Sequence, residues 1–212
     1  MSDSAISGPE RAPRRHHPVR PQKPQGVVYR RAIAKLACEL TLRTVDRERD
    51  LTVFHRWMND PRVAAFWEQT GNLEEQAAYL DKVARDAHTL AVLGCFDGDP
   101  LGYFELYWTK EDRIAPYYQA GDYDRGLHML VGEQRHRGPD KVEAWLSSLV
   151  HYLFLDEPRT QNIVAEPRAD NAKMIDYLVR CGFYQEKLFD FPHKRAALMI
   201  LPRQAFFDRF RL

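Results

Sequence analysis

Residues 125–154, RGLHMLVGEQRHRGPDKVEAWLSSLVHYLF, contain a strand pattern, a basic turn and a helix pattern in direct succession. Arg125–Val131 is largely apolar and predicts a strand, and the apolar spacing over Lys141–Phe154 predicts an amphipathic helix. The turn Arg135–Asp140 lies between them. Free backbone N–H groups at a helix start attract an anion, and arginines add charge-assisted hydrogen bonds. The turn therefore predicts a phosphate site, with an ordinary solvated turn as the alternative.

Further strand and helix patterns flank this segment. Asn59-Asp60-Pro61 should end the first flanking helix, because proline cannot continue the hydrogen-bond ladder. Strand hairpins at both ends and strand–helix units in the middle predict an α/β fold with a single mixed, mostly antiparallel sheet and helices on both faces. The strand patterns are Glu39–Thr44, His88–Phe96, Leu101–Thr109, Asn162–Ala165, Phe183–Phe189 and Arg195–Leu201, and the helix patterns are residues 51–58, Leu73–Arg85 and Asn171–Arg180.

Length and composition indicate one globular domain. The chain has 212 residues, of which 44% are hydrophobic and 29% charged, and its formal net charge is +1, which gives no general case for nucleic-acid binding. Cys38, Cys95 and Cys181 lack metal-type spacing and are expected to be buried thiols in a reducing compartment. No apolar run reaches the ~20 residues of a membrane span, and no apolar signal segment is visible. We expect a cytoplasmic protein with no metal, membrane or nucleic-acid partner.

The N-terminal residues differ in character from the rest. Residues 1–26 contain five prolines and a basic run at Arg14-Arg15-His16-His17, with almost no large apolar side chains. Such a segment buries too little surface to offset the entropy of ordering. We therefore predict a disordered, basic, proline-rich tail over residues 1–26 and a folded domain over residues 27–212. A basic arm that binds an anionic partner is the functional alternative for the tail.

The order of predicted elements resembles the GCN5-related N-acetyltransferase (GNAT) fold, in which a middle strand–loop–helix unit binds the pyrophosphate of acyl-CoA. The family's loop is commonly written Q/R-x-x-G-x-G/A, and Arg135, Gly138 and Asp140 occupy its fixed positions. Arg135 and Gly138 match. Asp140 departs, because a carboxylate that faced a phosphate would repel it. The alternative expectation for the Asp140 side chain is capping of the following helix.

Six further segments are similar to the siderophore-biosynthesis branch of this fold, and the resemblance covers residues 40–201. It implies a GNAT acyltransferase that moves an acetyl or succinyl group from acyl-CoA to an N-hydroxylated diamine or lysine, with other siderophore-pathway enzymes as partners. Direct attack without an acyl-enzyme is expected, because no cysteine lies near the catalytic candidates. The segments are Trp57–Pro61, Phe66–Glu68, Gly102–Trp108, Tyr117-Tyr118, Asp124–His128 and Glu166–Asn171.

His128 and Glu166 are the predicted catalytic residues. His128 lies on the strand that leads into the basic turn, and Glu166 follows the next strand, so both should reach one edge of the sheet. Histidine titrates near working pH, and a neighbouring carboxylate can orient the ring or accept a proton. In the branch that this chain resembles, residues at these positions form the proposed base pair. Without the resemblance, His128 would be a half-buried strand residue and Glu166 a capping or surface carboxylate.

The cofactor candidates surround the basic turn and the start of the helix after Glu166. The resemblance implies that a backbone N–H at Met129 or Leu130 meets the thioester oxygen. Capping is the alternative for Asn171, and packing is the alternative for Tyr177. The full set is Met129, Leu130, Arg135, Arg137, Gly138, Asn171, Lys173 and Tyr177.

Aromatic and acidic residues predict the acceptor side. Rings can hold an aliphatic chain and a cationic end, and carboxylates can pair with an ammonium group. The alternation of strand residues places Tyr103, Glu105 and Tyr107 on one face, which is the preferred acceptor face because it carries the charge. Core packing is the alternative for several rings. The full set of substrate-binding candidates is Trp67, Glu68, Tyr103, Glu105, Tyr107 and Tyr117.

Two other functional readings stay open at this level. One is acylation of an unmodified lysine side-chain amine with a longer acyl chain, and the other is a non-catalytic protein that binds acyl-CoA or an acyl carrier, which Asp140 would favour. The sequence also leaves open whether the acceptor is a lysine, cadaverine or putrescine derivative. A partner for an α-carboxylate would decide, and the basic residues that qualify are Arg62, Lys110, Arg113 and Arg125.

Overall fold

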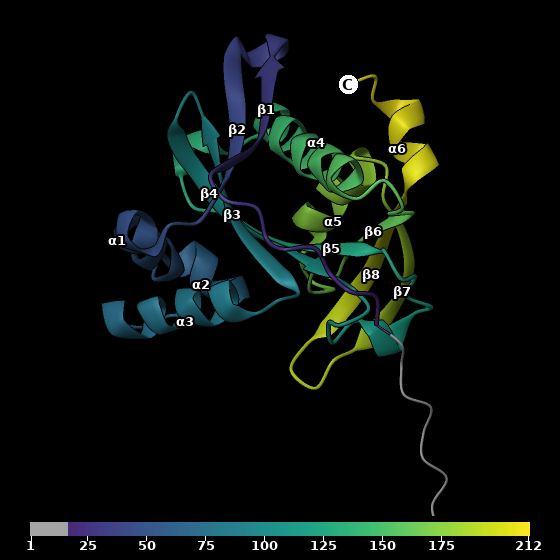
Figure 1. The fold of residues 1–212 in the computed structure, drawn as a ribbon, viewed down its shortest axis with the longest axis horizontal. Helices are drawn as coiled ribbons and strands as arrows, with labels where there is room; N and C mark the ends of the chain where they lie inside the picture. Colours follow the sequence, from purple (N-terminus) through teal and green to yellow (C-terminus); the bar gives the residue numbers. More distant parts are fainter. Residues whose placement is uncertain (1–16) are drawn as a thin grey trace, which may run out of the picture.

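The computed structural model describes residues 17–212, and one eight-stranded sheet lies at its centre (Figure 1). The strand order is β1-β2-β3-β4-β5-β6-β8-β7, and every neighbouring pair is antiparallel except the parallel pair of β5 and β6. The predicted mixed, mostly antiparallel sheet is therefore confirmed. The strands are β1 Val27–Ile33, β2 Cys38–Thr44, β3 Thr89–Phe96, β4 Asp99–Trp108, β5 Arg125–Val131, β6 Asn162–Ala165, β7 Tyr184–Asp190 and β8 Arg195–Pro202.

Helices cover both faces of this sheet, as the sequence predicts (Figure 1). Helices α1 to α3 pack on one face, and α4, α5 and α6 pack on the other. No helix among residues 17–212 is both long enough and apolar enough to cross a membrane. The helices are α1 Arg47–Met58, α2 Pro61–Trp67, α3 Leu73–Arg85, α4 Pro139–Asp156, α5 Ala172–Arg180 and α6 Arg203–Arg209, with short 3-10 helices at Ala34–Leu36, Ala115–Tyr117 and Gln134–His136.

Pro61 both ends one helix and begins another. Helix α1 stops at Met58, as predicted, and Pro61 then occupies the first turn of α2, where its missing N–H group is not needed. The Asp60 carboxylate accepts a hydrogen bond from the Arg62 N–H at 2.9 Å and caps α2. Helix α2 was not expected, nor were β1 and α6. Each of these elements has only seven residues, so its pattern is short and it depends on tertiary packing.

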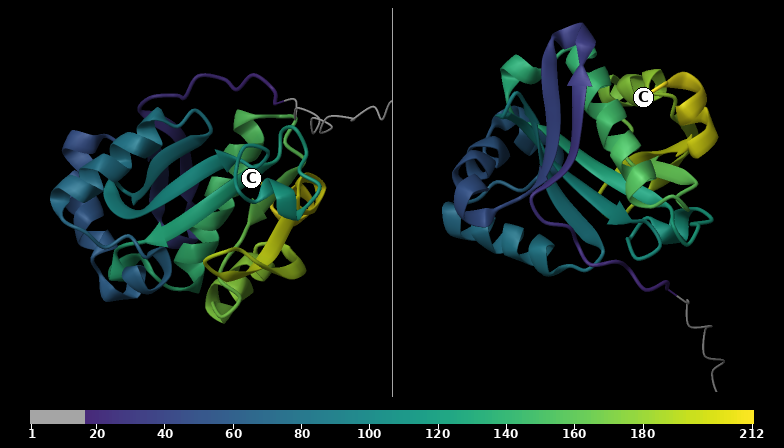
Figure 2. Two further views of the ribbon diagram at one scale, coloured as in Figure 1. Left: turned by 90° about the horizontal axis from the view of Figure 1, so that it is seen from below. Right: turned by 45° about the horizontal axis from the view of Figure 1, so that its top comes forward.

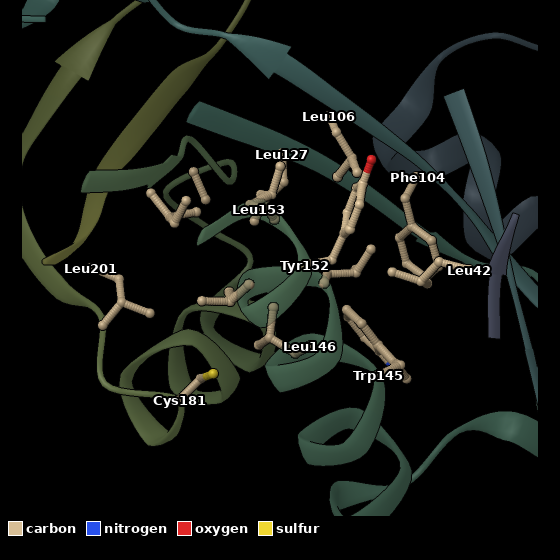
Figure 3. Close-up of a cluster of buried hydrophobic side chains, with 14 of the residues drawn as sticks. Leu42, Phe104, Leu106, Leu127, Trp145, Leu146, Tyr152, Leu153, Cys181 and Leu201 are labelled. Atoms are coloured by element: carbon tan, nitrogen blue, oxygen red, sulfur yellow. The ribbon is translucent and has the colours of Figure 1, made fainter. Parts of the chain in front are cut away.

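Two hydrophobic cores flank the sheet. The larger core fills the space between the sheet and α4, where Trp145 packs against Phe104 with ring centroids 5.3 Å apart (Figure 3). The smaller core joins α1 to α3 to the opposite face, where Tyr103 and Leu130 are buried side by side on β4 and β5. Both faces of the strand pair β4–β5 are thus fixed by packing.

Strands β5 and β6 separate after a short contact. Their parallel pairing covers only Arg125 with Ile163 and Gly126 with Val164. Beyond Gly126, β5 continues to Val131 along β4 alone, so the backbone groups on its other edge have no strand partner among residues 17–212. This opening in the sheet, followed by the turn into α4, is where the site forms.

Part of the predicted tail lies on the domain. Residues 1–16 are outside the described part of the chain, whereas residues 17–26 run from the segment after β4 to the start of β1 (Figure 2). The Arg20 guanidinium donates to both oxygens of Glu111, at 3.0 and 2.8 Å, and lies 4.2 Å above the Trp108 ring centroid. The Lys23 ammonium donates to the Val83 carbonyl at 2.8 Å. Residues 17–26 are therefore attached by specific contacts rather than free.

Candidate active site

The centre of the site is the ring of His128, which lies between two carboxylates. Its Nε2 is 2.6 Å from Oε1 of Glu166, and its Nδ1 is 3.1 Å from Oε2 of Glu105. The His128 side chain is 24% exposed, whereas the side chains of Glu105 and Glu166 are 8% and 0% exposed. The predicted pairing of His128 with Glu166 is thus present in the structure, and Glu105 completes a three-residue unit.

Strand pairing explains this arrangement. Glu105 on β4 faces His128 on β5 across the antiparallel ladder, so their side chains leave the sheet on the same face. Glu166 directly follows the end of β6, beside the point where β5 and β6 separate. The sheet therefore delivers all three side chains to one place.

Three tyrosine hydroxyls satisfy the outer oxygens of the carboxylates. Tyr79 and Tyr103 donate to Oε1 of Glu105 at 2.6 and 2.9 Å, and Tyr107 donates to Oε2 of Glu166 at 2.7 Å. The Tyr107 ring can reach across β5 because residue 126 is glycine: a Cβ there would lie 2.1 Å from the ring. These donors stabilise the ionised form of both carboxylates.

The electrostatics favour a charged ring. Burial by itself favours the neutral imidazole, but the charges of Glu166 and Glu105 and their hydrogen bonds outweigh it and raise the pKa of His128 well above its usual value. Burial likewise acts to raise the pKa of Glu166, and the His128 charge overcomes this and lowers it. The raised pKa of His128 and the lowered pKa values of Glu105 and Glu166 favour one imidazolium beside two carboxylates, a unit of net charge minus one.

A cavity of about 420 Å³ opens above this unit. His128 and Glu166 line it, together with three of the predicted substrate residues, Trp67, Glu68 and Glu105. The other three substrate predictions lie outside the lining. Tyr103 and Tyr107 are buried beneath it as carboxylate donors, and Tyr117 packs against Phe189 with ring centroids 4.6 Å apart. Packing demand, which single-strand alternation does not reveal, takes these rings into the interior.

A second cavity of about 150 Å³ lies between β5, α4 and α5. Seven of the predicted cofactor residues line it, and these are Met129, Leu130, Arg137, Gly138, Asn171, Lys173 and Tyr177. Gly138 has a φ of +117°, a backbone conformation that favours glycine, and it directly precedes α4. The two cavities meet, because Trp67 and Met129 line both.

Two residues of the basic turn do not face this second cavity. Arg135 is held by Asp99 at 2.7 and 2.8 Å and by Glu133 at 2.6 Å, so its guanidinium is already paired. Asp140 is exposed and accepts a hydrogen bond from Lys35 at 2.7 Å, and in the described part of the chain no side chain caps the start of α4. The expected capping role of Asp140 is therefore wrong, and its carboxylate is neutralised by a lysine instead.

The backbone of Met129 faces the junction of the cavities. Its carbonyl accepts a hydrogen bond from the Trp67 indole at 3.3 Å, and the Gly132 N–H bonds to the Leu101 carbonyl on the β4 side. Because N–H and C=O of one strand residue point the same way and alternate along the strand, the Met129 N–H also points away from β4. Of the two candidate donors, Leu130 is directed at β4, and Met129 directs its N–H group away from β4, where no backbone partner lies among residues 17–212.

Two residues of the site were not anticipated. Tyr79 comes from α3, and Lys194 comes from the β7–β8 hairpin and lines the larger cavity, as does Arg113, one of the four basic residues that the sequence offered. Glu105 was expected to hold substrate, whereas it holds His128. Its place on the charged face of β4 was a usable signal, but its partner is set by the register of two strands.

Comparison with known proteins identifies the family. The family model of the acetyltransferase (GNAT) domain matches residues 46–191. The chain belongs to the GNAT acetyltransferase family. The crystal structure of an uncharacterized protein from Bacillus halodurans is 31% identical with a TM-score of 0.83, and the match covers 88% of this chain and 95% of that one. An aminoglycoside acetyltransferase in complex with coenzyme A is 24% identical with a TM-score of 0.72 over 82% of this chain and 99% of its own, which shows the shared GNAT fold.

Two named relatives are more similar in sequence. The N(6)-hydroxylysine O-acetyltransferase of Escherichia coli is 47% identical over 93% of this GNAT chain and 62% of its own length. The N(5)-hydroxyornithine:cis-anhydromevalonyl coenzyme A-N(5)-transacylase of Beauveria bassiana is 47% identical over 94% of this chain and 45% of its own length. The chain thus spans less than two thirds of either relative.

Proposed function

We propose that this GNAT domain, residues 27–212, transfers an acetyl or succinyl group from acyl-CoA to the nitrogen of an N-hydroxylated side-chain amine and forms a hydroxamate. The observation that carries the proposal is the Glu105–His128–Glu166 unit at the junction of two cavities. The relatives' names support this substrate class, since they specify hydroxylysine and hydroxyornithine.

The smaller cavity would hold the acyl-CoA arm. Its lining includes Arg137 and Lys173, two cations for phosphate, and the start of α4, where the N–H groups that follow Pro139 have no side-chain cap among residues 17–212. The thioester carbonyl would meet the Met129 N–H, which stabilises negative charge as it develops on the oxygen. In this placement the thioester lies beside the cavity that His128 lines.

The chemistry needs a neutral nitrogen and a proton acceptor. Attack by the hydroxylamine nitrogen on the thioester carbon places positive charge on nitrogen and negative charge on oxygen. The unit of net charge minus one stabilises the positive nitrogen, and a carboxylate oxygen of the unit accepts the N–H proton directly. Collapse of the adduct breaks the C–S bond and releases the CoA thiolate, which then takes up a proton.

The direct test is release of free thiol. The protein is incubated with acetyl-CoA or succinyl-CoA and with N6-hydroxylysine, N-hydroxycadaverine or lysine. We expect thiol release with a hydroxylated acceptor, and a product that gives a coloured complex with ferric iron because N-acylation creates a hydroxamate. No thiol release with any pair would refute the enzyme, and a product that does not bind ferric iron would refute N-acylation in favour of O-acylation.

A His128 variant tests whether the Glu105–His128–Glu166 unit carries out the reaction. His128→Ala should lose most of the thiol release, with the Arg195→Gln variant of an exposed residue on β8 as the control. A rate for His128→Ala equal to that of the unmodified protein would contradict the assignment of the unit while leaving the activity intact.

A further inference from the structure

Two cations on the rim of the larger cavity lack carboxylate partners. Arg113 and Lys194 both line the cavity, and among residues 17–212 neither makes an ion pair with an acidic side chain. Arg168, a third cation of the lining, is bound to Asp170 at 2.7 Å. Arg113 and Lys194 are therefore the two lining cations left to meet an incoming anion.

One aromatic ring brings these two cations together. The Arg113 guanidinium lies 5.3 Å from the Phe191 ring centroid, and the Lys194 ammonium lies 5.5 Å from it. Arg113 comes from the segment after β4, and Lys194 comes from the β7–β8 hairpin, so the site exists only in the folded chain. Two cations held near one small ring suit a compact anion such as a carboxylate.

Lys194 is also the better buried of the two. Burial lowers the pKa of its ammonium group, and the charges of Glu166 and Asp112 offset this effect only in part. Its one hydrogen bond among the described residues runs to the Glu166 carbonyl at 2.8 Å. A bound carboxylate would complete the partial compensation of this buried charge.

The other candidates for these positions are already engaged. Arg125 is bound to Asp156 at 2.8 Å, Arg62 is bound to Asp60 at 2.6 Å, and Lys110 is paired with Asp122. Of the four basic residues that the sequence offers for an α-carboxylate, Arg113 is the one that lines the cavity above His128 without an ion pair among residues 17–212.

We propose that Arg113 and Lys194 form a carboxylate subsite, so that the acceptor is an amino acid with a hydroxylated side-chain amine rather than a simple diamine. This inference rests on the proposed acyl transfer. Lys194 contacts the backbone of Glu166, and Arg113 and Lys194 line the same cavity as His128, so a carboxylate bound there would share that cavity with the catalytic unit. The cavity then offers two cations to the carboxylate of the acceptor and the negatively charged Glu105–His128–Glu166 unit to its hydroxylamine nitrogen.

A carboxylate could also come from the acyl donor, since succinyl-CoA carries one. Arg113 and Lys194 line the larger cavity but not the smaller one, where the acyl-CoA arm is proposed. The acceptor is therefore the source that the geometry favours.

The test compares two acceptors that differ only in the carboxylate. N6-hydroxylysine and N-hydroxycadaverine have the same chain, ammonium and hydroxylamine groups. Their binding is measured by calorimetry without acyl-CoA, so the result does not depend on turnover. We expect hydroxylysine to bind at least about tenfold more tightly, the increment of one charge-assisted hydrogen bond. Arg113→Gln and Lys194→Gln should remove this preference, Arg113→Lys should restore much of it, and Arg195→Gln should leave it unchanged.

Two outcomes would overturn the subsite. Equal binding of both acceptors by the unmodified protein would do so, as would an equal loss for both acceptors in Arg113→Gln. Kinetics with acetyl-CoA and succinyl-CoA add a third: an effect of Arg113→Gln confined to succinyl-CoA would assign the carboxylate to the acyl group. Failure of the proposed function would look different, as absence of thiol release while the binding preference persists.

Discussion

Replacing Glu105 by glutamine should shift the ionisation of His128. The substitution keeps the side-chain volume, and its carbonyl oxygen can still accept the hydroxyls of Tyr79 and Tyr103, which lie 2.6 and 2.9 Å from Oε1. The amide NH₂ group then faces Nδ1 of His128, which is 3.1 Å from Oε2. Because an NH₂ group only donates, it favours a neutral ring with an unprotonated Nδ1.

The size of this shift follows from the contact that is lost. A hydrogen bond to a charged group contributes about 1.5–3 kcal/mol, and one pKa unit corresponds to about 1.36 kcal/mol. Glu105→Gln should therefore lower the pKa of His128 by about one to two units. Glu166 remains at 2.6 Å from Nε2, so the pKa should stay above that of a free histidine.

The measurement is a ¹⁵N NMR titration of the His128 ring in the unmodified protein and in the variant. Tyr103→Phe is the control, because it removes a donor to Glu105 and keeps the charge that faces the ring. Identical titration of His128 in the two proteins would refute the role assigned to Glu105. A His128 ring that titrates near about 6.5 in the unmodified protein would refute the charged unit as a whole.

Three further predictions concern the cofactor turn, the packing of the site and its pH response. Arg137→Gln should raise KM for acetyl-CoA by about tenfold, the increment of one charge-assisted hydrogen bond. Arg135→Gln should change this KM little, because Asp99 and Glu133 already bind that guanidinium. Equal KM changes for the two variants in steady-state assays would contradict this prediction. Gly126→Ala should lower the free energy of unfolding in urea by about 2–4 kcal/mol, because the added Cβ collides with the Tyr107 ring that crosses β5. An unchanged urea midpoint of unfolding would count against this packing. The raised pKa of His128 stabilises the fold fully below the unfolded pKa of about 6.5, and this contribution is lost as pH rises through the folded pKa. Urea titrations of Glu166→Gln should show a smaller loss of unfolding free energy as pH rises. A decline as steep as that of the unmodified protein would argue against the His128–Glu166 pair.

Local patterns in the sequence predict the elements that carry the site. The strand over Arg125–Val131 and the helix over Leu73–Arg85 are found at the predicted bounds, because alternation, helical spacing and capping residues act within a few positions. The approach of His128 to Glu166 also follows from strand order, since neighbouring strand ends meet at one edge of a sheet. The family resemblance adds the cofactor side, where seven of the eight predicted residues line one cavity.

The predictions for Arg135 and Tyr117 differ from the structure because tertiary contacts engage both side chains. Arg135 matches the loop pattern, but Asp99 on β4 binds its guanidinium, and that contact spans 36 residues of chain. Tyr117 is taken into a core with Phe189 and Phe191. Glu133 is a local partner of Arg135, but Asp99 and the phenylalanines that pack on Tyr117 lie far away in sequence, so no local pattern contains them.

The sequence by itself determined which chemistry the chain carries, because histidine, carboxylates and a basic glycine turn are fixed by residue type and spacing. Tertiary structure decided which of these groups meet. The register of β4 and β5 places Glu105, which was predicted to bind substrate, opposite His128 as its partner. The β7–β8 hairpin places Lys194 beside Glu166. Charge and pKa depend on distances of a few ångströms between groups that only folding brings together, and this is why the site's ionisation state belongs to the structure.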